Sequence, residues 1–337
     1  MLDIETLKKI DKNAMFETYD KWAEISKNSY NSDLGGIEFK DIDHIVFVGM
    51  GGSGTLGDIF SSILSKTNIH VSLVKGYLLP KTVDKNSLVI FTSVSGNTTE
   101  TLYALKTAKQ QECNTISFSS GGLLETYCKK NNLEYRNIAK NHSPRSSFAA
   151  YLYSMLRILE KVIPIKKNEV INSIKELEKL NKKISSKNLT VKNPALKLAN
   201  EICGIPLIYY PWGLQAAAIR FKNSLQENAK THAIIEDVVE ASHNGIVAWE
   251  KNSQIYPILL QGHDDYLKTK ERWGIFKTYF DNRKITYNEI FSIKGDILSK
   301  LTHLVYLLDY TSIYKAVLSK TDPSPVKSID FIKSKLK

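Results

Sequence analysis

The hydrophobic pattern of the chain changes character near residue 90, where an apolar run gives way to small polar residues and then to an amphipathic segment. Leu88–Phe91 is an unbroken apolar run, typical of a strand buried on both faces of a parallel sheet. This strand should end at Thr92. Beyond a polar stretch, apolar side chains recur at helical spacing, at Leu102, Leu105 and Ala108. The pattern therefore predicts a buried strand, a polar turn and a helix in succession.

The first half of the chain repeats this alternation of short apolar runs with stretches of helical length. The predicted strands are Ile45–Val48, Val71–Val74, Leu88–Phe91 and Thr115–Phe118. Before them, the first ~40 residues are typical of one or two amphipathic helices, with a break at Gly35-Gly36. Strands that alternate with helices predict a doubly wound parallel sheet, whose functional loops gather at the carboxyl ends of the strands.

The second half begins with a long lysine-rich helix and then alternates again. Its predicted strands and helices are Pro206–Tyr210, Gly213–Glu227, Ile255–Leu260, Tyr266–Phe280, Ile285–Phe291 and Asp296–Tyr314. We predict an α/β protein with two flavodoxin-like doubly wound domains. The first domain spans residues 1–150, and residues 151–337 hold the linking helix, the second sheet and a C-terminal tail that returns to the site.

Composition narrows the class of protein. The net charge of +11 is carried by residues 157–197 (11 basic, 4 acidic) and 315–337 (6 basic, 2 acidic). The first segment is typical of a solvated helix face, and no nucleic-acid module accompanies it, so we expect no nucleic acid partner. The N-terminal segment MLDIETLKKIDKN carries three acids and lacks an apolar signal core, and no run is long enough to span a membrane, which favours the cytoplasm.

Neither a metal site nor a disulfide framework is predicted. Cys113, Cys128 and Cys203 lie far apart, as reduced thiols would, and no His/Asp/Glu cluster has ligand spacing. We therefore expect neither a metal nor another cofactor.

The polar turn after Leu88–Phe91 has the composition of a phosphate site. Its short hydroxyl side chains, the backbone N–H groups freed by Gly96 and the following helix N-terminus would converge on a small anion. The hydroxyls are Ser93, Ser95, Thr98 and Thr99. An ordinary Ser/Thr-rich turn explains the same residues equally well.

A glycine-rich loop, Gly49-Met50-Gly51-Gly52-Ser53-Gly54, follows the strand Ile45–Val48 and matches the dinucleotide pattern GxGxxG. The next strand, however, runs into Lys75 instead of an acid that would hold a ribose. A basic residue there suits a 2′-phosphate, so NADP binding stays an alternative. Two hydroxyl-bearing loops at neighbouring strand ends fit one compact sugar phosphate better.

These two loops, VGMGGSG and SVSGNTTETL, resemble the sugar isomerase (SIS) domain. Two later stretches, KNSLQENAK and EASHN, are similar to the bifunctional phosphoglucose/phosphomannose isomerase family, which pairs two SIS domains in one chain. The resemblance implies that Gly52 and Ser53 bind the substrate phosphate. The second loop would add Ser93, Ser95 and Thr98.

The resemblance also implies roles for three catalytic residues. Arg145, at a predicted helix start where its charge opposes the dipole, would steady the anionic intermediate. His243 would open the sugar ring from the neighbouring subunit, so the active unit would be a homodimer. Lys333, with Lys315 as the alternative, would assist ring opening from the tail. Ser242 stands where the family more often has asparagine, and Val326 lies near the place where some members have threonine.

Glu227 closes the predicted Gly213 helix on the same face as Arg220 and Asn223. A surface pair with Lys230 would explain it simply. At a helix C-terminus, however, the dipole favours proton uptake, as a proton-abstracting carboxylate requires. We assign Glu227 the transfer between C1 and C2 through an enediolate. The predicted function is isomerisation of glucose 6-phosphate and fructose 6-phosphate, and of mannose 6-phosphate, and the alternative is a noncatalytic phosphosugar sensor.

Overall fold

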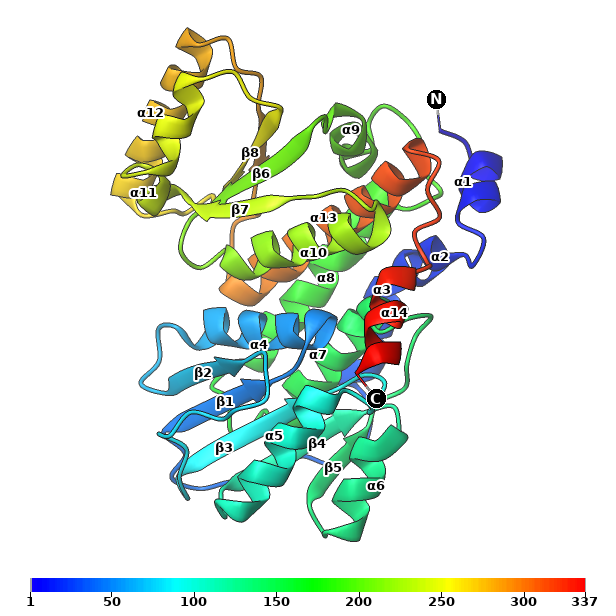
Figure 1. Cartoon of the computed structure of the whole chain (residues 1–337), viewed down its shortest axis with the longest axis vertical. Coiled ribbons are helices and arrows are strands. Elements are labelled where there is room, and N and C mark those ends of the chain that lie inside the picture. The colour runs from blue at the N-terminus through cyan, green and yellow to red at the C-terminus, as the bar shows by residue number, and fades with distance from the viewer. Residues whose placement is uncertain (1, 337) are drawn as a thin grey trace. The chain divides into compact units, whose positions relative to one another are not determined.

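The strands within residues 2–336, the part of the chain that the computed structural model describes, form two fully parallel sheets. Each sheet is the centre of one unit (Figure 1). The β1–β5 unit comprises residues 21–178 and 295–302. The β6–β9 unit comprises the segment up to Asp20, residues 179–294 and the segment from His303 onward. The predicted domain boundary at residue 150 stays a prediction. Each unit is built from more than one segment of the chain.

The β1–β5 sheet has the strand order β2-β1-β3-β4-β5, which is the flavodoxin-like order. Its strands are β1 (His44–Val48), β2 (His70–Val74), β3 (Ser87–Thr92), β4 (Asn114–Ser119) and β5 (Glu134–Asn137). The first four confirm the predicted strands, whereas β5 has a polar sequence that gave no signal. Because Val48 pairs with Phe91, the loops that leave β1 and β3 begin side by side at one edge.

Helices cover both faces of this sheet (Figure 1). Val46, Val48, Val89 and Phe91 pack against α5 (Thr99–Gln110) and α6 (Gly122–Lys130). On the other face, Phe47 stacks on Phe60 of α4 (Gly51–Leu64) with 5.1 Å between ring centroids. α7 (Phe148–Ile158) contacts α4 and α3 (Trp22–Tyr30). A buried strand with apolar residues on both faces is what this layering requires.

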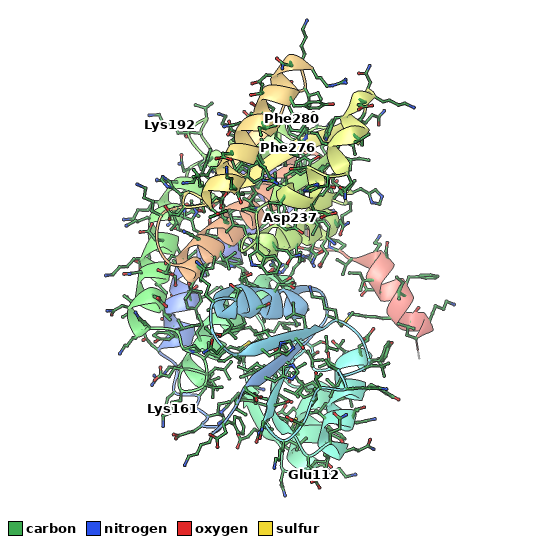
Figure 2. All side chains as sticks on the ribbon, turned by 90° about the vertical axis from the view of Figure 1, so that its left-hand side faces the viewer. Glu112, Lys161, Lys192, Asp237, Phe276 and Phe280 are labelled. Carbon is green, nitrogen blue, oxygen red and sulfur yellow. The ribbon has the colours of Figure 1, made fainter. Side chains whose placement is uncertain are left out.

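The β6–β9 sheet has the order β7-β6-β8-β9. Its strands are β6 (Ile205–Tyr210), β7 (Ile234–Asp237), β8 (Ile255–Gln261) and β9 (Asn288–Phe291). β7 was not predicted from the sequence. Tyr209 and Leu259 lie against α12 (Leu267–Asn282), where Phe276 and Phe280 are one turn apart with centroids 5.9 Å apart (Figure 2). α10 (Gln215–Asn228) contacts β6 and β7.

The remaining elements complete the chain. They are α1 (Ile4–Ile10), α2 (Met15–Asp20), η1 (Arg145–Ser147), α8 (Lys167–Ile184), α9 (Pro194–Glu201), α11 (Val238–Ala241), η2 (Gly245–Glu250), α13 (Ile297–Leu318) and α14 (Lys327–Lys335). α8 is the predicted lysine-rich helix, with Val170, Leu177 and Ile184 buried. None of the helices described has the length and apolarity of a membrane span. The three cysteines are free thiols: Cys128 is buried, Cys113 is half-buried and Cys203 is exposed.

Candidate active site

The predicted site residues divide between the two units. Gly52, Ser53, Ser93, Ser95, Thr98 and Arg145 belong to the β1–β5 unit, and Glu227, His243 and Lys333 belong to the β6–β9 unit. Each set is built on its own sheet and helices.

The glycine-rich loop turns directly from β1 into α4. Gly51 has φ +53°, and a side chain on Gly54 would place its Cβ 2.7 Å from the carbonyl oxygen of Gly49. The backbone angle of Gly51 favours glycine, and at Gly54 the tight loop leaves no room for a side chain. Gly52 and Ser53 consequently fall in the first turn of α4, where backbone N–H groups and the helix dipole favour an anion. Ser53 is buried at this end.

The second loop carries its hydroxyls on a fixed frame. The amide of Ser93 donates to Phe118 on β4 (3.0 Å), and the Ser93 and Thr98 hydroxyls lie 2.8 Å apart in a hydrogen bond. Thr98 precedes the first residue of α5, and Ser95 is exposed. Ser93 and Thr98 can thus meet one acceptor together, while a helix N-terminus lies directly behind them.

A third loop, after β4, fixes the second one. Gly96 has φ +67°, and a Cβ there would lie only 1.8 Å from the carbonyl oxygen of Gly121. Asn97 Oδ1 accepts from the amide of Leu123 (3.0 Å), and the carbonyl of Gly96 accepts from the amide of Leu124 (2.8 Å). This backbone approach explains the SGN sequence structurally, and it gives the hydroxyls a rigid base.

A small hollow lies beside the glycine-rich loop, lined by Gly49, Ser53, Lys75 and Thr92, the last residue of β3, among others. Lys75 does not lie free at its edge. Its ammonium donates to both carboxylate oxygens of the buried Asp58 on α4, each at 2.7 Å. The residue that kept NADP binding as an alternative therefore pairs with a helix of its own unit, which removes the argument for a 2′-phosphate site.

Arg145 opens the one-turn helix η1, and only 5% of its surface is exposed. The hydroxyl of Ser147 ties the segment together, because its one proton is shared between the carbonyl oxygens of Asn141 (3.0 Å) and Ser143 (2.9 Å). η1 packs against α4, the helix that carries Ser53. A buried guanidinium thus stands in the same unit as the glycine-rich loop, in a segment whose geometry is set by local hydrogen bonds.

Glu227 lies one residue before the end of α10 and is half-buried. The ammonium of Lys230, the neighbour considered for a surface pair, donates to the carbonyls of Glu227 (2.7 Å), Asp322 (3.2 Å) and Pro323 (3.2 Å). Lys230 itself has φ +54°, as a residue just past a helix end often does. The helix terminus beside Glu227 is therefore closed by a cation that also holds the start of the tail.

Arg220, two turns earlier, is buried with Asp309 of α13. Its Nη2 lies 2.7 Å from the carboxylate. Burial alone would lower the pKa of Arg220, but the charges of Asp309 and Glu227, together with the hydrogen bonds to Asp309, outweigh burial and raise it. Sequence reasoning missed Asp309. The only signal was a lone acid within the apolar run of α13, which in a buried helix demands a cationic or hydrogen-bonding partner.

His243 is exposed in the turn between α11 and η2, beyond the carboxyl end of β7. Its amide donates to Glu240 O (2.9 Å), and the side-chain amide of Asn244 donates to Glu240 Oε1 (2.7 Å). Ser242 donates its hydroxyl to Val238 O (2.8 Å), so serine is accommodated at this position by a local bond. The imidazole thus projects from a turn that is held on both sides.

The two lysines considered for ring opening have different surroundings. Lys315 on α13 donates to Ile202 O at 2.7 Å, and burial lowers its pKa. Lys333 is exposed on α14, which follows Val326. Lys315 is thus engaged with backbone, and the role of either lysine in ring opening stays a prediction. Within residues 2–336, no group of three or more His, Cys, Asp or Glu side chains could hold a metal ion.

Comparison with known proteins agrees with this two-part architecture. The model of the SIS domain matches residues 38–155, and the model of the bacterial phospho-glucose isomerase C-terminal SIS domain matches residues 191–336. A bifunctional phosphoglucose/phosphomannose isomerase of Caldicellulosiruptor bescii is 32% identical over 95% of this chain and 96% of its own. This chain belongs to the bifunctional phosphoglucose/phosphomannose isomerase family.

Other similar proteins carry either the same name or the name of another enzyme. An Aquifex aeolicus protein with the same name is 31% identical over 87% of this chain and 90% of its own. A D-glucosamine-6-phosphate 4-epimerase of Sulfolobus acidocaldarius is 27% identical over 73% of this chain and 77% of its own. Similarity to this group therefore includes proteins named for two different reactions.

Solved structures share the fold of the family. The C-terminal domain of glucosamine-fructose-6-phosphate aminotransferase from Francisella tularensis superposes with a TM-score of 0.66 at 16% identity, covering 92% of this chain and 98% of its own. A hypothetical protein of Thermus thermophilus gives 0.70 at 12% identity, covering 98% and 88%. These likenesses concern the backbone arrangement, and they bear out the predicted pair of SIS-type parallel sheets.

Proposed function

We propose that this protein is a cofactor-independent aldose–ketose isomerase that interconverts glucose 6-phosphate and fructose 6-phosphate and also accepts mannose 6-phosphate. The observation that carries the proposal is the pair of hydroxyl-bearing loops at the adjacent ends of β1 and β3, in a chain of this family. The substrate class comes from the names of the relatives, and the role of each site residue is argued from its chemistry and surroundings.

The substrate phosphate would bind at the β1–β5 edge. First-turn N–H groups of α4 near Gly52 and Ser53, and the hydroxyls of Ser93, Ser95 and Thr98, are the donors. Each favours a dianion, because N–H and O–H groups at a helix N-terminus place partial positive charge on one point. Phosphate binding would use no metal, since the loops themselves provide the donors.

The reaction moves one proton between C1 and C2, so a single base that accepts and returns it suffices. Glu227 takes this role in the proposal. Arg145 would stabilise the negative charge of the cis-enediolate, because a buried guanidinium is a fixed cation that needs no reorganisation as charge develops. Reprotonation on either face, with rotation about C2–C3 of the open chain, would yield glucose or mannose 6-phosphate.

Ring opening requires an acid at the ring oxygen and a base at the anomeric hydroxyl. His243, with assistance from Lys333, takes this step in the proposal, and the histidine comes from the neighbouring subunit of a homodimer. Large apolar side chains on the same sheet edge support a dimer. Trp212 is 78% exposed and Tyr266 is 76% exposed, and they follow the carboxyl ends of β6 and β8. Such residues are enriched at protein interfaces.

The Glu227→Gln substitution tests the base. The variant should lose conversion of fructose 6-phosphate while it still binds inorganic phosphate, because the phosphate donors lie in the other unit. Glu271→Gln is the matched control, since Glu271 is a glutamate of the same unit that pairs with Lys268 on the surface of α12. Turnover retained by Glu227→Gln would remove Glu227 from the mechanism.

A substrate panel tests the reaction class. Wild-type protein should convert fructose 6-phosphate to glucose and mannose 6-phosphates with chelator present, as followed by NMR of the sugars. Glucosamine 6-phosphate belongs in the panel because one relative is named as its 4-epimerase. Phosphosugar binding without any conversion would favour the noncatalytic sensor instead.

A further inference from the structure

Asp309 is a fully buried carboxylate in the middle of the otherwise apolar helix α13. Nε and Nη2 of Arg220 donate to it at 3.1 and 2.7 Å, the hydroxyl of Ser224 at 2.6 Å, and the hydroxyl of Tyr19 at 3.1 Å. All four residues belong to the β6–β9 unit. This one carboxylate therefore binds two successive turns of α10 to α13.

The polar contact continues along the same face of α10. The side-chain amide of Asn228 donates to the hydroxyl of Ser312 at 2.8 Å, and both residues are fully buried. Arg220, Ser224 and Asn228 are spaced at i, i+4 and i+8, so they form one row along the helix. Directional bonds at both ends of this row fix the rotation of α10 and its position along α13.

Glu227 lies at the end of this row, next to Asn228 and seven residues after Arg220, hence close to the same side of the helix. Its charge contributes to the raised pKa of Arg220, so the two side chains interact. A slip of α10 by one residue would move Glu227 by about 1.5 Å along the axis and rotate it by about 100°.

A buried ion pair is a poor device for stability alone, because well-packed apolar side chains often stabilise a core as well or better. What the ion pair provides is a fixed helix register. Apolar side chains of two helices can slide past one another, whereas the four donors of Asp309 can reach it in only one register of the helices. We propose that Asp309 is a positioning residue for the reaction, and that it holds α10 in the register that aims Glu227 at the substrate. This inference rests on the proposed role of Glu227.

The Asp309→Asn substitution tests the inference because it should change kcat without changing phosphate binding. We expect kcat for fructose 6-phosphate to fall at least about tenfold, since small misplacements of a catalytic group cost this much or more. The inhibition constant of inorganic phosphate should stay within about twofold, because the phosphate donors are in the β1–β5 unit. All rates are compared at a temperature where both proteins are fully folded.

Asp20→Asn is the matched control. Asp20 is also a hydrogen-bonded carboxylate of the β6–β9 unit, held by Ser186 and Tyr310, but none of these bonds involves α10. It should lower the melting temperature and keep kcat. If Asp309→Asn fails to fold, Ser312→Ala removes only the far end of the row and should still lower kcat without changing phosphate inhibition.

Two outcomes overturn the inference separately. Unchanged kcat in folded Asp309→Asn, or equal kcat losses in Asp309→Asn and Asp20→Asn at equal losses of melting temperature, reduces Asp309 to a structural residue and leaves the proposed function intact. A wild-type protein that converts none of the hexose 6-phosphates overturns the proposed function, and the inference with it.

Discussion

The Ser93 and Thr98 hydroxyls are hydrogen-bonded to each other at 2.8 Å, although five residues and a change from strand to helix separate them. Each hydroxyl has one proton. One of the two protons makes the mutual bond, and the other can be donated to an acceptor in the space between β3 and α5. A phosphate oxygen that enters this space would replace the mutual bond with two bonds of its own.

Replacing Thr98 by valine should therefore weaken substrate binding. The shape is kept and one donor is lost, so KM for fructose 6-phosphate should rise about tenfold with little change in kcat. Steady-state kinetics measure both values. Thr107→Val on the same helix, whose hydroxyl bonds only to the carbonyl of Tyr103, is the control and should leave KM unchanged. An unchanged KM in Thr98→Val would contradict a phosphate role for this loop.

Replacing Gly96 by alanine should destabilise the β1–β5 unit. The added Cβ would meet the carbonyl of Gly121 at 1.8 Å in a backbone with φ +67°, so the two loops must separate. We expect a loss of about 2 kcal/mol or more in unfolding free energy. Urea denaturation of Gly274→Ala provides the comparison: Gly274 is exposed in α12 with no atom within 4 Å of its Cβ, and alanine should stabilise by about 0.5–1 kcal/mol.

Acid should destabilise the protein through His44. Burial lowers the pKa of His44 from 6.5, and the neighbouring His70 lowers it further, while Ser72 lies 2.9 Å from Nε2. The folded chain thus resists a proton that the unfolded chain accepts, so stability is lost as pH falls below 6.5. Melting temperatures measured down to pH 5 should fall less steeply in His44→Gln than in the wild type. If the melting temperature falls equally steeply with pH in both proteins, groups other than His44 cause the loss of stability in acid.

Mixing two inactive variants should restore activity if His243 acts across a dimer. Glu227→Gln and His243→Asn each lack one required group, but a mixed dimer contains one site with both groups intact. After subunit exchange, we expect about a quarter of the wild-type activity. Sedimentation should show a dimer in each sample. A mixture that remains inactive although its subunits exchange would place both groups in the same chain.

The sequence predicted the buried strands because their signal is local. Leu88–Phe91 is apolar on both faces, and the glycine and short polar residues after it indicate a turn. The two strands that escaped prediction, β5 and β7, lie at sheet edges. An edge strand needs neither a continuous apolar run nor great length, and Glu134–Asn137 has neither.

In the candidate site too, contacts between residues close in sequence could be predicted, whereas contacts between distant residues could not. Ser93 and Thr98 are close in sequence, so a loop pattern was enough to group them. Asp309 meets Arg220 across 89 residues, and no local pattern specifies such a partner. The sequence suggested a surface pair with Glu227 as the simple role of Lys230, and the structure adds its bonds to backbone carbonyls at the helix end. Side-chain partners that depend on tertiary packing require the structure.

Lys230 has a practical consequence for handling the protein. One ammonium joins the last turn of α10 to Asp322 and Pro323, which lie 92 and 93 residues further along the chain. Trimming the C-terminus back to this point, or fusing an affinity tag directly after it, would disturb the helix end that bears Glu227. Enzyme preparations meant for kinetics are therefore better tagged at the opposite end of the polypeptide.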